Sequence, residues 1–242
     1  MMRNTKKEQK LVHWIKVVVL GSGAVGKSAL TVRYLTDRFI HDYDPTFEDI
    51  YEDEKKPIVV DDEQYALRIV DTAGQIEDIE NSFQMRHIAS ADVVMYVFSL
   101  TESQTLHDLI SLKDRIDGMS ATPKPSVMVG NKSDLTHMRC VSQEEAMGVA
   151  NNLNCSYFEM SVASSSRESV DTVFQSAVKL AVDSQKVLEN QKDGKSVGKS
   201  VKSALKWLKK VHRRKSVCSP MFFYVSPVAD ESSHQSPPAT FV

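Results

Sequence analysis

The sequence lacks the features that carry a protein into or across a membrane. Its 242 residues contain no apolar run of about eighteen residues, which is close to the minimum for a transmembrane helix. The first seven residues have neither the apolar core of a signal peptide nor the glycine at position 2 that myristoylation requires. We therefore expect a cytoplasmic protein that is not secreted.

Cysteine is scarce. The three cysteines, Cys140, Cys155 and Cys218, are odd in number and show no metal-ligand spacing. This argues against a disulfide framework and against a zinc site. Free thiols are the expectation.

The whole chain has little excess of either charge, but one segment is strongly basic. The net charge is −2, yet residues 192–215 carry +9, so the rest of the chain carries −11. The composition, 41% hydrophobic and 26% charged, is typical of a soluble globular protein. We expect a flexible leader at 1–12, a folded domain at 13–190, a basic amphipathic segment at 191–216 and a disordered Ser/Pro-rich tail at 217–242.

Strand-like and helix-like segments alternate through the expected domain. Apolar runs predict strands at 15–20, 58–60, 65–70, 92–98, 127–130 and 157–160. Helical patterns occupy residues from 27 to 35, 103–117, a stretch from 142, and 168–188. The strands are continuously apolar, which is typical of a sheet covered on both faces. We predict an α/β fold with a mostly parallel six-stranded sheet, one antiparallel edge strand in a hairpin, and helices on both faces.

A glycine-rich loop joins the first predicted strand to the first helix. Residues 21–28, called the phosphate loop below, read GSGAVGKS and match the P-loop pattern of two glycines separated by four residues and followed by Lys-Ser. In this pattern backbone N–H groups and a helix N-terminus face one anion, Lys27 reaches the terminal phosphates, and the Ser28 hydroxyl faces a magnesium ion. The sequence therefore predicts a P-loop nucleotide-binding protein.

Four further motifs follow the phosphate loop in order: Thr46, residues 71–75 (DTAGQ), residues 131–134 (NKSD) and residues 159–161 (EMS). With them, residues 15–188 resemble the Ras family of small GTPases. The absence of a C-terminal prenylation box, together with the basic tail, makes the chain similar to the branch that contains the Ras-related oestrogen-regulated growth inhibitor. The resemblance implies that residues 13–190 are a GTPase domain using Mg²⁺ and GTP/GDP.

The resemblance assigns the guanine nucleotide to a set of residues along these motifs. They are Gly21, Ser22, Gly23, Ala24, Val25, Gly26, Lys27, Ser28, Ala29, Phe39, Tyr43, Thr46, Gly74, Asn131, Lys132, Asp134, Ser161 and Val162. Among them Asp134 selects guanine, because a carboxylate can accept from the ring N–H and the exocyclic amine that adenine does not present together. Asn131 is expected to tie its loop to the phosphate loop, the Lys132 stem and Phe39 to cover the base, and the Ser161 and Val162 N–H groups to meet the guanine oxygen.

The resemblance also implies how hydrolysis would proceed. Ser28 and Thr46 would ligate magnesium directly, Asp71 would do so through water, and Gln75 would orient the attacking water. No arginine that could stabilise the developing charge is evident near these motifs, so hydrolysis is expected to be slow until a GTPase-activating protein supplies one. Loops around Thr46 and Gln75 would respond to the nucleotide and contact that protein, an exchange factor and effectors.

The sequence departs from the family pattern at three places. Met160, Val162 and Ala163 replace the usual residues of the last motif, Ile76 and Asp78 alter the segment after Gln75, and residues 52–57 lengthen the hairpin by about three residues. Because of these departures, the alternative remains that the chain is an interaction module that binds guanine nucleotide and hydrolyses it only weakly. An ATP-using enzyme of the same fold is disfavoured by Asp134.

The basic segment reads as an amphipathic helix, with apolar residues recurring every three or four positions among lysines and arginines. Residues 195–215 could contact an anionic membrane at the cytosolic face of the plasma membrane, calmodulin or nucleic acid, or form only a solvated helix. Cys218 could be palmitoylated, and the ending Thr240-Phe241-Val242 matches a PDZ ligand. A monomer is expected.

Overall fold

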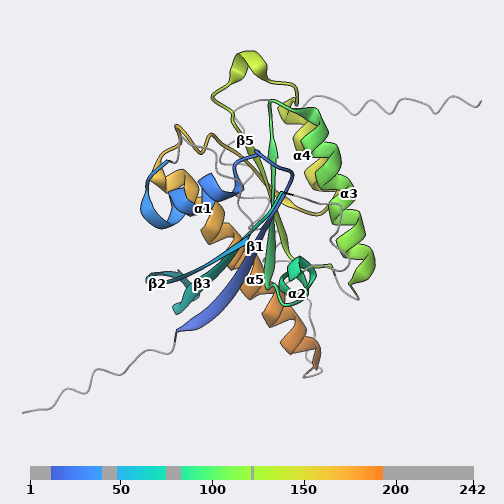
Figure 1. The fold of residues 1–242 in the computed structure, drawn as a ribbon. Helices are drawn as coiled ribbons and strands as arrows, with labels where there is room; N and C mark the ends of the chain where they lie inside the picture. Colours follow the sequence, from blue (N-terminus) through green and yellow to red (C-terminus); the bar gives the residue numbers. More distant parts are fainter. Residues whose placement is uncertain (1–11, 40–47, 75–82, 121–122, 193–242) are drawn as a thin grey trace, which may run out of the picture.

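A computed structural model describes residues 12–39, 48–74, 83–120 and 123–192 (Figure 1). Six strands form one sheet in the order β2-β3-β1-β4-β5-β6. They are β1 (His13–Leu20), β2 (Glu48–Val60), β3 (Glu63–Thr72), β4 (Val93–Ser99), β5 (Ser126–Asn131) and β6 (Ser156–Glu159). Edge strand β2 is antiparallel to β3, and every other pair is parallel. The predicted fold class is confirmed.

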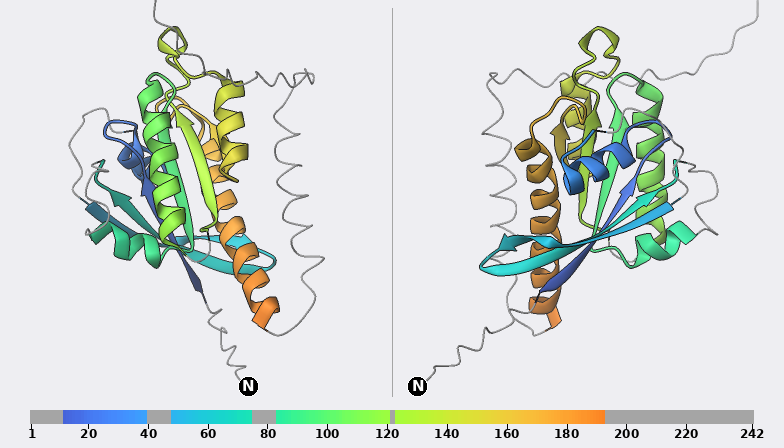
Figure 2. Two further views of the ribbon diagram at one scale, coloured as in Figure 1. Left: turned by 90° about the vertical axis from the view of Figure 1, so that its right-hand side faces the viewer. Right: turned by 60° about the vertical axis from the view of Figure 1, so that its left-hand side comes forward.

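Helices cover both faces of this sheet (Figure 2). They are α1 (Lys27–Thr36), α2 (Phe83–Ala89), α3 (Ser103–Met119), α4 (Gln143–Asn152) and α5 (Arg167–Lys192), with a 3₁₀ turn, η2 (Thr136–Met138). Val17 and Val19 of β1 pack in the core shared with α1 and α5, whereas Val18 packs in the core shared with α3 and α4. Both neighbours are buried because each face has its own helical layer, and this explains the continuously apolar strands.

Several element boundaries differ from the sequence-based expectation. The polar residues near Asp49, which lie outside the strands predicted from the sequence, belong to β2, where Ile50 pairs with Val70 of β3. An edge strand pairs with a neighbour on one side only and is partly exposed to solvent, so its sequence need not be apolar. Helix α2 was not predicted, because its pattern covers only two turns. Helix α4 begins where the sequence predicts, and Ser142 caps it, since Ser142 Oγ accepts from Glu145 N at 3.1 Å.

The hairpin of β2 and β3 contains the predicted lengthening. Asp53 pairs with Leu67 and Ile58 pairs with Tyr65, so β2 advances five residues while β3 advances two. Three residues of β2 are therefore extra, and they form a bulge beside the end of α1, where Lys56 Nζ donates to Leu35 O at 3.3 Å.

None of the helices in the described ranges combines the length and the apolar character that crossing a bilayer would take.

Candidate functional site

The predicted nucleotide-binding residues meet at the carboxyl ends of the parallel strands. The phosphate loop follows β1, Gly74 follows β3, Asn131 ends β5, and Ser161 follows β6. Ligands of open α/β sheets bind at this edge, because the loops that leave neighbouring strands converge there. Segments far apart in the sequence are thus brought to one place.

Two glycines of the phosphate loop are required by backbone geometry. Gly21 has φ +147°, and a Cβ built on it would lie 2.0 Å from Val97 O. Gly26 has φ +99°, and its Cβ would lie 2.4 Å from Asn131 Nδ2. L-residues rarely adopt such φ values, so glycine lets the loop turn back and approach its neighbours closely. Between them Gly23 and Ala24 are exposed, and Val25 is buried.

Lys27 is a buried cation at the start of α1. Its side chain is almost enclosed, and Nζ donates to Ser22 O at 2.9 Å across the phosphate loop. Burial lowers the pKa of Lys27 to about 8, and the nearby Asp71 partly offsets this effect. A cation held between a glycine-rich loop and a helix N-terminus is suited to an anionic ligand.

Asp71 and Ser28 supply oxygen ligands beside this cation. The Asp71 side chain is fully buried, and burial raises the pKa of its carboxyl group, while the Ser28 hydroxyl and Lys27 act in the opposite direction. Thr72 holds this end of β3 against β1, since its Oγ1 donates to Val19 O at 2.8 Å. Carboxylate and hydroxyl oxygens are the donors that Mg²⁺ prefers, so these residues fit the ion.

No cluster of three or more His, Cys, Asp or Glu side chains suited to a metal occurs in the described ranges.

Asn131 joins two loops of the site. Its Nδ2 donates to Val25 O at 2.8 Å, which is the predicted link to the phosphate loop. Its Oδ1 accepts from Lys132 N at 2.8 Å and from Val162 N at 3.0 Å. The side chain is buried, so leaving these groups unpaired would be costly and the arrangement is held firmly.

The loop after Asn131 presents Asp134 to solvent. Lys132 has φ +68°, a conformation that L-residues seldom adopt and that often marks functional sites. Asp134 is exposed, and no side chain within the described segments pairs with its carboxylate. Its oxygens are therefore available as acceptors.

Residues 161–166, called the serine loop below, follow β6 and are braced by their own hydrogen bonds. Ser161 N donates to Ser165 Oγ at 3.1 Å, Ser165 N to Ser161 O at 2.7 Å, and Ser164 N to Ser161 Oγ at 3.1 Å. The two N–H groups predicted to meet a guanine oxygen, at Ser161 and Val162, thus already have protein acceptors. Contact with a base would need those hydrogen bonds to be shared or exchanged.

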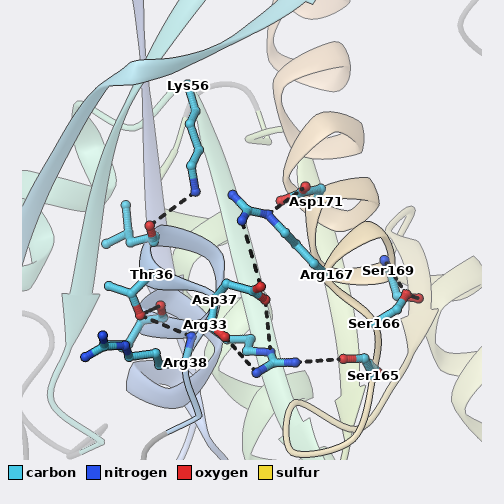
Figure 3. A network of polar contacts seen from close by, with 12 residues as sticks. Arg33, Thr36, Asp37, Arg38, Lys56, Ser165, Ser166, Arg167, Ser169 and Asp171 are labelled. Carbon is cyan, nitrogen blue, oxygen red and sulfur yellow. Dashed lines mark hydrogen bonds and ion pairs between the residues drawn. The ribbon is translucent and has the colours of Figure 1, made fainter.

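The serine loop is also held by contacts from outside the motifs, which no sequence pattern indicated. Arg33 of α1 donates from Nη2 to Ser165 O at 3.2 Å and from Nη1 to Asp37 O at 2.9 Å (Figure 3). Arg167 Nη1 lies 3.8 Å from Asp37 Oδ2, and Arg167 Nε lies 3.7 Å from Asp171 Oδ2. Arg33 and Ser165 are 132 positions apart, and no local pattern links them.

A second missed contact braces the loop that carries Asp134. Arg139 pairs with Glu159 of β6 through two parallel hydrogen bonds, Nη1 to Oε1 at 2.7 Å and Nη2 to Oε2 at 2.8 Å. Tyr157 OH adds a third, at 3.1 Å. The Arg139 guanidinium holds the pKa of Glu159 below its usual range, against the opposing effect of burial.

The remaining predicted residues divide into two groups. Phe39 and Ala29 are half-buried and pack against the core shared with α1 and α5, so stacking of Phe39 on a base stays a prediction. Tyr43, Thr46 and Gln75 lie outside the described residues, as do the basic segment and the C-terminal tail.

Comparison with known proteins agrees with this geometry. The Ras family matches residues 16–183. The chain is 38% identical to the GTP-binding protein Rit1 of Mus musculus over 201 residues, covering 83% of this chain and 88% of that protein. It is 38% identical to the Ras-related protein ralB-B of Xenopus laevis (84% and 96% covered) and 34% identical to the Ras-like protein rasX of Dictyostelium discoideum (86% and 96% covered).

The branch within the family stays a prediction. Membership of the family itself is shown, because the family match spans most of the chain and the relatives are similar over nearly their whole lengths. The chain belongs to the Ras family of small GTPases, the signalling switches that hydrolyse GTP.

Proposed function

We propose that this Ras-family protein binds GTP and GDP together with Mg²⁺ at the carboxyl edge of its sheet and signals through the loops around Thr46 and Gln75. The observation that carries the proposal is the shared framework around Asn131. One buried amide side chain fixes the phosphate loop at Val25 and the serine loop at Val162, with Asp134 exposed three residues away.

The phosphate end of the site uses the phosphate loop and Lys27. Backbone N–H groups of residues 21–28 and the N-terminus of α1 would surround the β- and γ-phosphates. Lys27, whose ammonium lies 2.9 Å from Ser22 O, would add a compact positive charge beside them. Ser28 and Thr46 would hold Mg²⁺, with Asp71 acting through water; bound Mg²⁺ neutralises charge on the phosphates.

The base end uses Asp134, Lys132 and Phe39. Asp134 would accept two hydrogen bonds from guanine, and the Lys132 stem and Phe39 would cover its faces. Ala163 stands where the family pattern has a lysine, so the support of that lysine stem is lost. The bracing of the serine loop by Arg33 and Ser165 would replace it.

Hydrolysis would be slow without a partner. Gln75 would orient the attacking water, and a GTPase-activating protein would supply an arginine for about 10³–10⁵ in rate. Ras-family proteins act with activating proteins, exchange factors and effectors. The altered residues Ile76 and Asp78 suggest that the activating protein of this chain differs from that of Ras.

Base selection tests the proposal. Asp134→Asn exchanges one acceptor oxygen for a donor amide, so affinity for GDP should fall by about 100-fold or more, and xanthine nucleotides should bind better than guanine nucleotides. The measurement is competition of GDP, XDP and ADP against a fluorescent nucleotide. Asp114→Asn, an exposed position on α3, is the matched control and should behave as wild type. Unchanged guanine preference in Asp134→Asn, or preference of the wild type for ADP, would refute the proposal.

We also propose that the protein is cytoplasmic and associates peripherally with anionic membrane through residues 195–215. The support is the net charge of +9 on residues 192–215 combined with helical apolar spacing. Co-sedimentation with phosphatidylserine vesicles should occur at low salt and weaken at high salt. No binding at low salt would rule it out. The calmodulin contact and the PDZ-type ending stay predictions of the sequence.

A further inference from the structure

A hydrogen bond links the phosphate loop to helix α3. Ser22 Oγ donates to Asp108 Oδ2 at 2.8 Å, and the two residues are 86 positions apart. We propose that this hydrogen bond positions the phosphate loop and slows the release of bound nucleotide. The inference rests on the proposed function and adds Asp108 to it as a positioning residue that does not itself touch the ligand.

Asp108 is a fixed anchor. Its second oxygen, Oδ1, accepts from Gln104 Nε2 at 2.8 Å. The neighbouring Leu106 and Leu109 are buried in the core between α3 and the sheet. Thr105 adds a tie to β4, since its Oγ1 accepts from Ser99 N at 3.0 Å. Because both carboxylate oxygens and the helix are held, the partner that gains order from the hydrogen bond is Ser22.

The backbone of Ser22 touches two groups that serve the nucleotide. Its carbonyl accepts from Lys27 Nζ at 2.9 Å. A Cβ built on Gly74 would lie 3.0 Å from Ser22 C and 2.5 Å from Gly23 N, so the backbone of Gly74 rests on the Ser22–Gly23 peptide. Restricting the Ser22 side chain therefore restricts the peptide between the phosphate-binding lysine and the glycine that begins the next loop.

Because Asp108 is negatively charged, positioning and charge repulsion predict opposite changes in the rate of nucleotide release when Asp108 is removed. A carboxylate one hydrogen bond from the phosphate loop repels phosphates, so by Coulomb's law alone its removal should slow nucleotide release. Positioning predicts the opposite, because the freed Ser22 peptide lets the loop open more often. The two effects are separated by the direction of the change.

The test measures dissociation of a fluorescent GDP from the full-length protein in Mg²⁺. Ser22→Ala and Asp108→Ala should each release GDP about three to ten times faster than wild type, as expected for the loss of one intramolecular hydrogen bond of ordinary strength. The double variant should be no faster than the faster single variant, since both changes remove the same contact. Asp108→Asn keeps an acceptor oxygen and should stay within about twofold of wild type, as should Asp114→Asn on the same helix.

The outcomes separate this inference from the proposed function. Wild-type rates or slower release in Asp108→Ala, or release from Asp108→Asn as fast as from Asp108→Ala, would overturn the inference. So would a lowered thermal midpoint of the GDP-bound single variants with unchanged GDP release, because that marks a purely structural contact. A wild-type protein that binds no guanine nucleotide would overturn the proposed function instead.

Discussion

Single residues of the site are constrained by close approach as much as by ligand chemistry. Gly26 shows this most directly, because its Cα faces Asn131 and leaves no space for a side chain. Gly148 of α4 is the contrast: it is exposed, and a Cβ there would meet no atom within 4 Å. The same residue type is therefore structural at one position and replaceable at another.

Gly26→Ala should lower the free energy of unfolding by about 1–3 kcal/mol, because alanine is strained at φ +99° and displaces Asn131 Nδ2. It should also weaken GDP binding, since Asn131 then loses its hold on Val25. Gly148→Ala, the control, should gain up to about 1 kcal/mol from helix propensity. Urea unfolding measures both. Equal effects of the two substitutions would contradict the close-approach argument.

Motif spacing identified Asp134 and Lys27, because their roles depend on residues that are close in sequence. It could not identify Arg33, Ser165 or Arg139 as supports of the site. The Arg33–Ser165 and Arg139–Glu159 contacts span 132 and 20 positions of the chain, and only the packing of α1, β6 and α5 brings these residues together.

At the scale of elements, the Arg139–Glu159 pair fastens the loop after β5 to β6. Both side chains are about three-quarters enclosed, at 27% and 23% exposure, so solvent screens the pair only partly. The Arg68–Glu52 pair between β3 and β2 has a similar distance of 2.7 Å but 46% and 52% exposure. The two pairs form a natural comparison.

Arg139→Gln should lower the free energy of unfolding by about 2 kcal/mol at pH 7, while Arg68→Gln should change it by less than about 1 kcal/mol. The pKa of Glu159 is lowered in the folded protein, so the stabilisation is complete above its unfolded value of about 4.3 and is lost as pH falls through the lower folded value. The difference between wild type and Arg139→Gln should therefore shrink below about pH 4. Denaturant titrations from pH 7 to pH 3 measure this, and a difference independent of pH would show that ionised Glu159 is not the cause.

The hairpin illustrates what a sequence can and cannot give for an element. Its length was predictable by comparison with the family pattern, and the pairing of Asp53 and Ile58 places the three extra residues in one bulge. That the polar residues from Glu48 onward continue β2 was not predictable. Pairing with β3 decides it, and that pairing is a long-range contact.

For the whole molecule, the ligand site and the fold depend on each other. Loops from four strands meet at one edge, and buried polar groups such as Lys27 and Asp71 lie between them. A ligand that binds only the folded state adds to the free energy of unfolding by mass action. Under the proposed function, buried Lys27 would face the phosphates and buried Asp71 the magnesium ion, so their environment would change most when the ligands leave.

Removing Mg²⁺ with EDTA and dialysing away the nucleotide should therefore lower the thermal midpoint, by roughly 10 °C if GDP was present at about 1,000 times its Kd. Adding back GDP with Mg²⁺ should restore the midpoint, whereas ADP with Mg²⁺ should not. Thermal unfolding followed by circular dichroism gives the measurement. An unchanged midpoint after verified removal of the nucleotide would contradict the assigned site.

The sequence by itself determined the parallel strands, most of their helical cover and the phosphate loop, because these follow from apolar periodicity and from glycine spacing within short windows. It also determined which acidic residue could select a base. Only the tertiary structure decided which residues outside the motifs hold the site: Arg33 on Ser165, Arg139 on Glu159, and Asp108 on Ser22. Each of these contacts joins residues that become neighbours when the strands pair and the helices pack, and no local pattern records such a pairing.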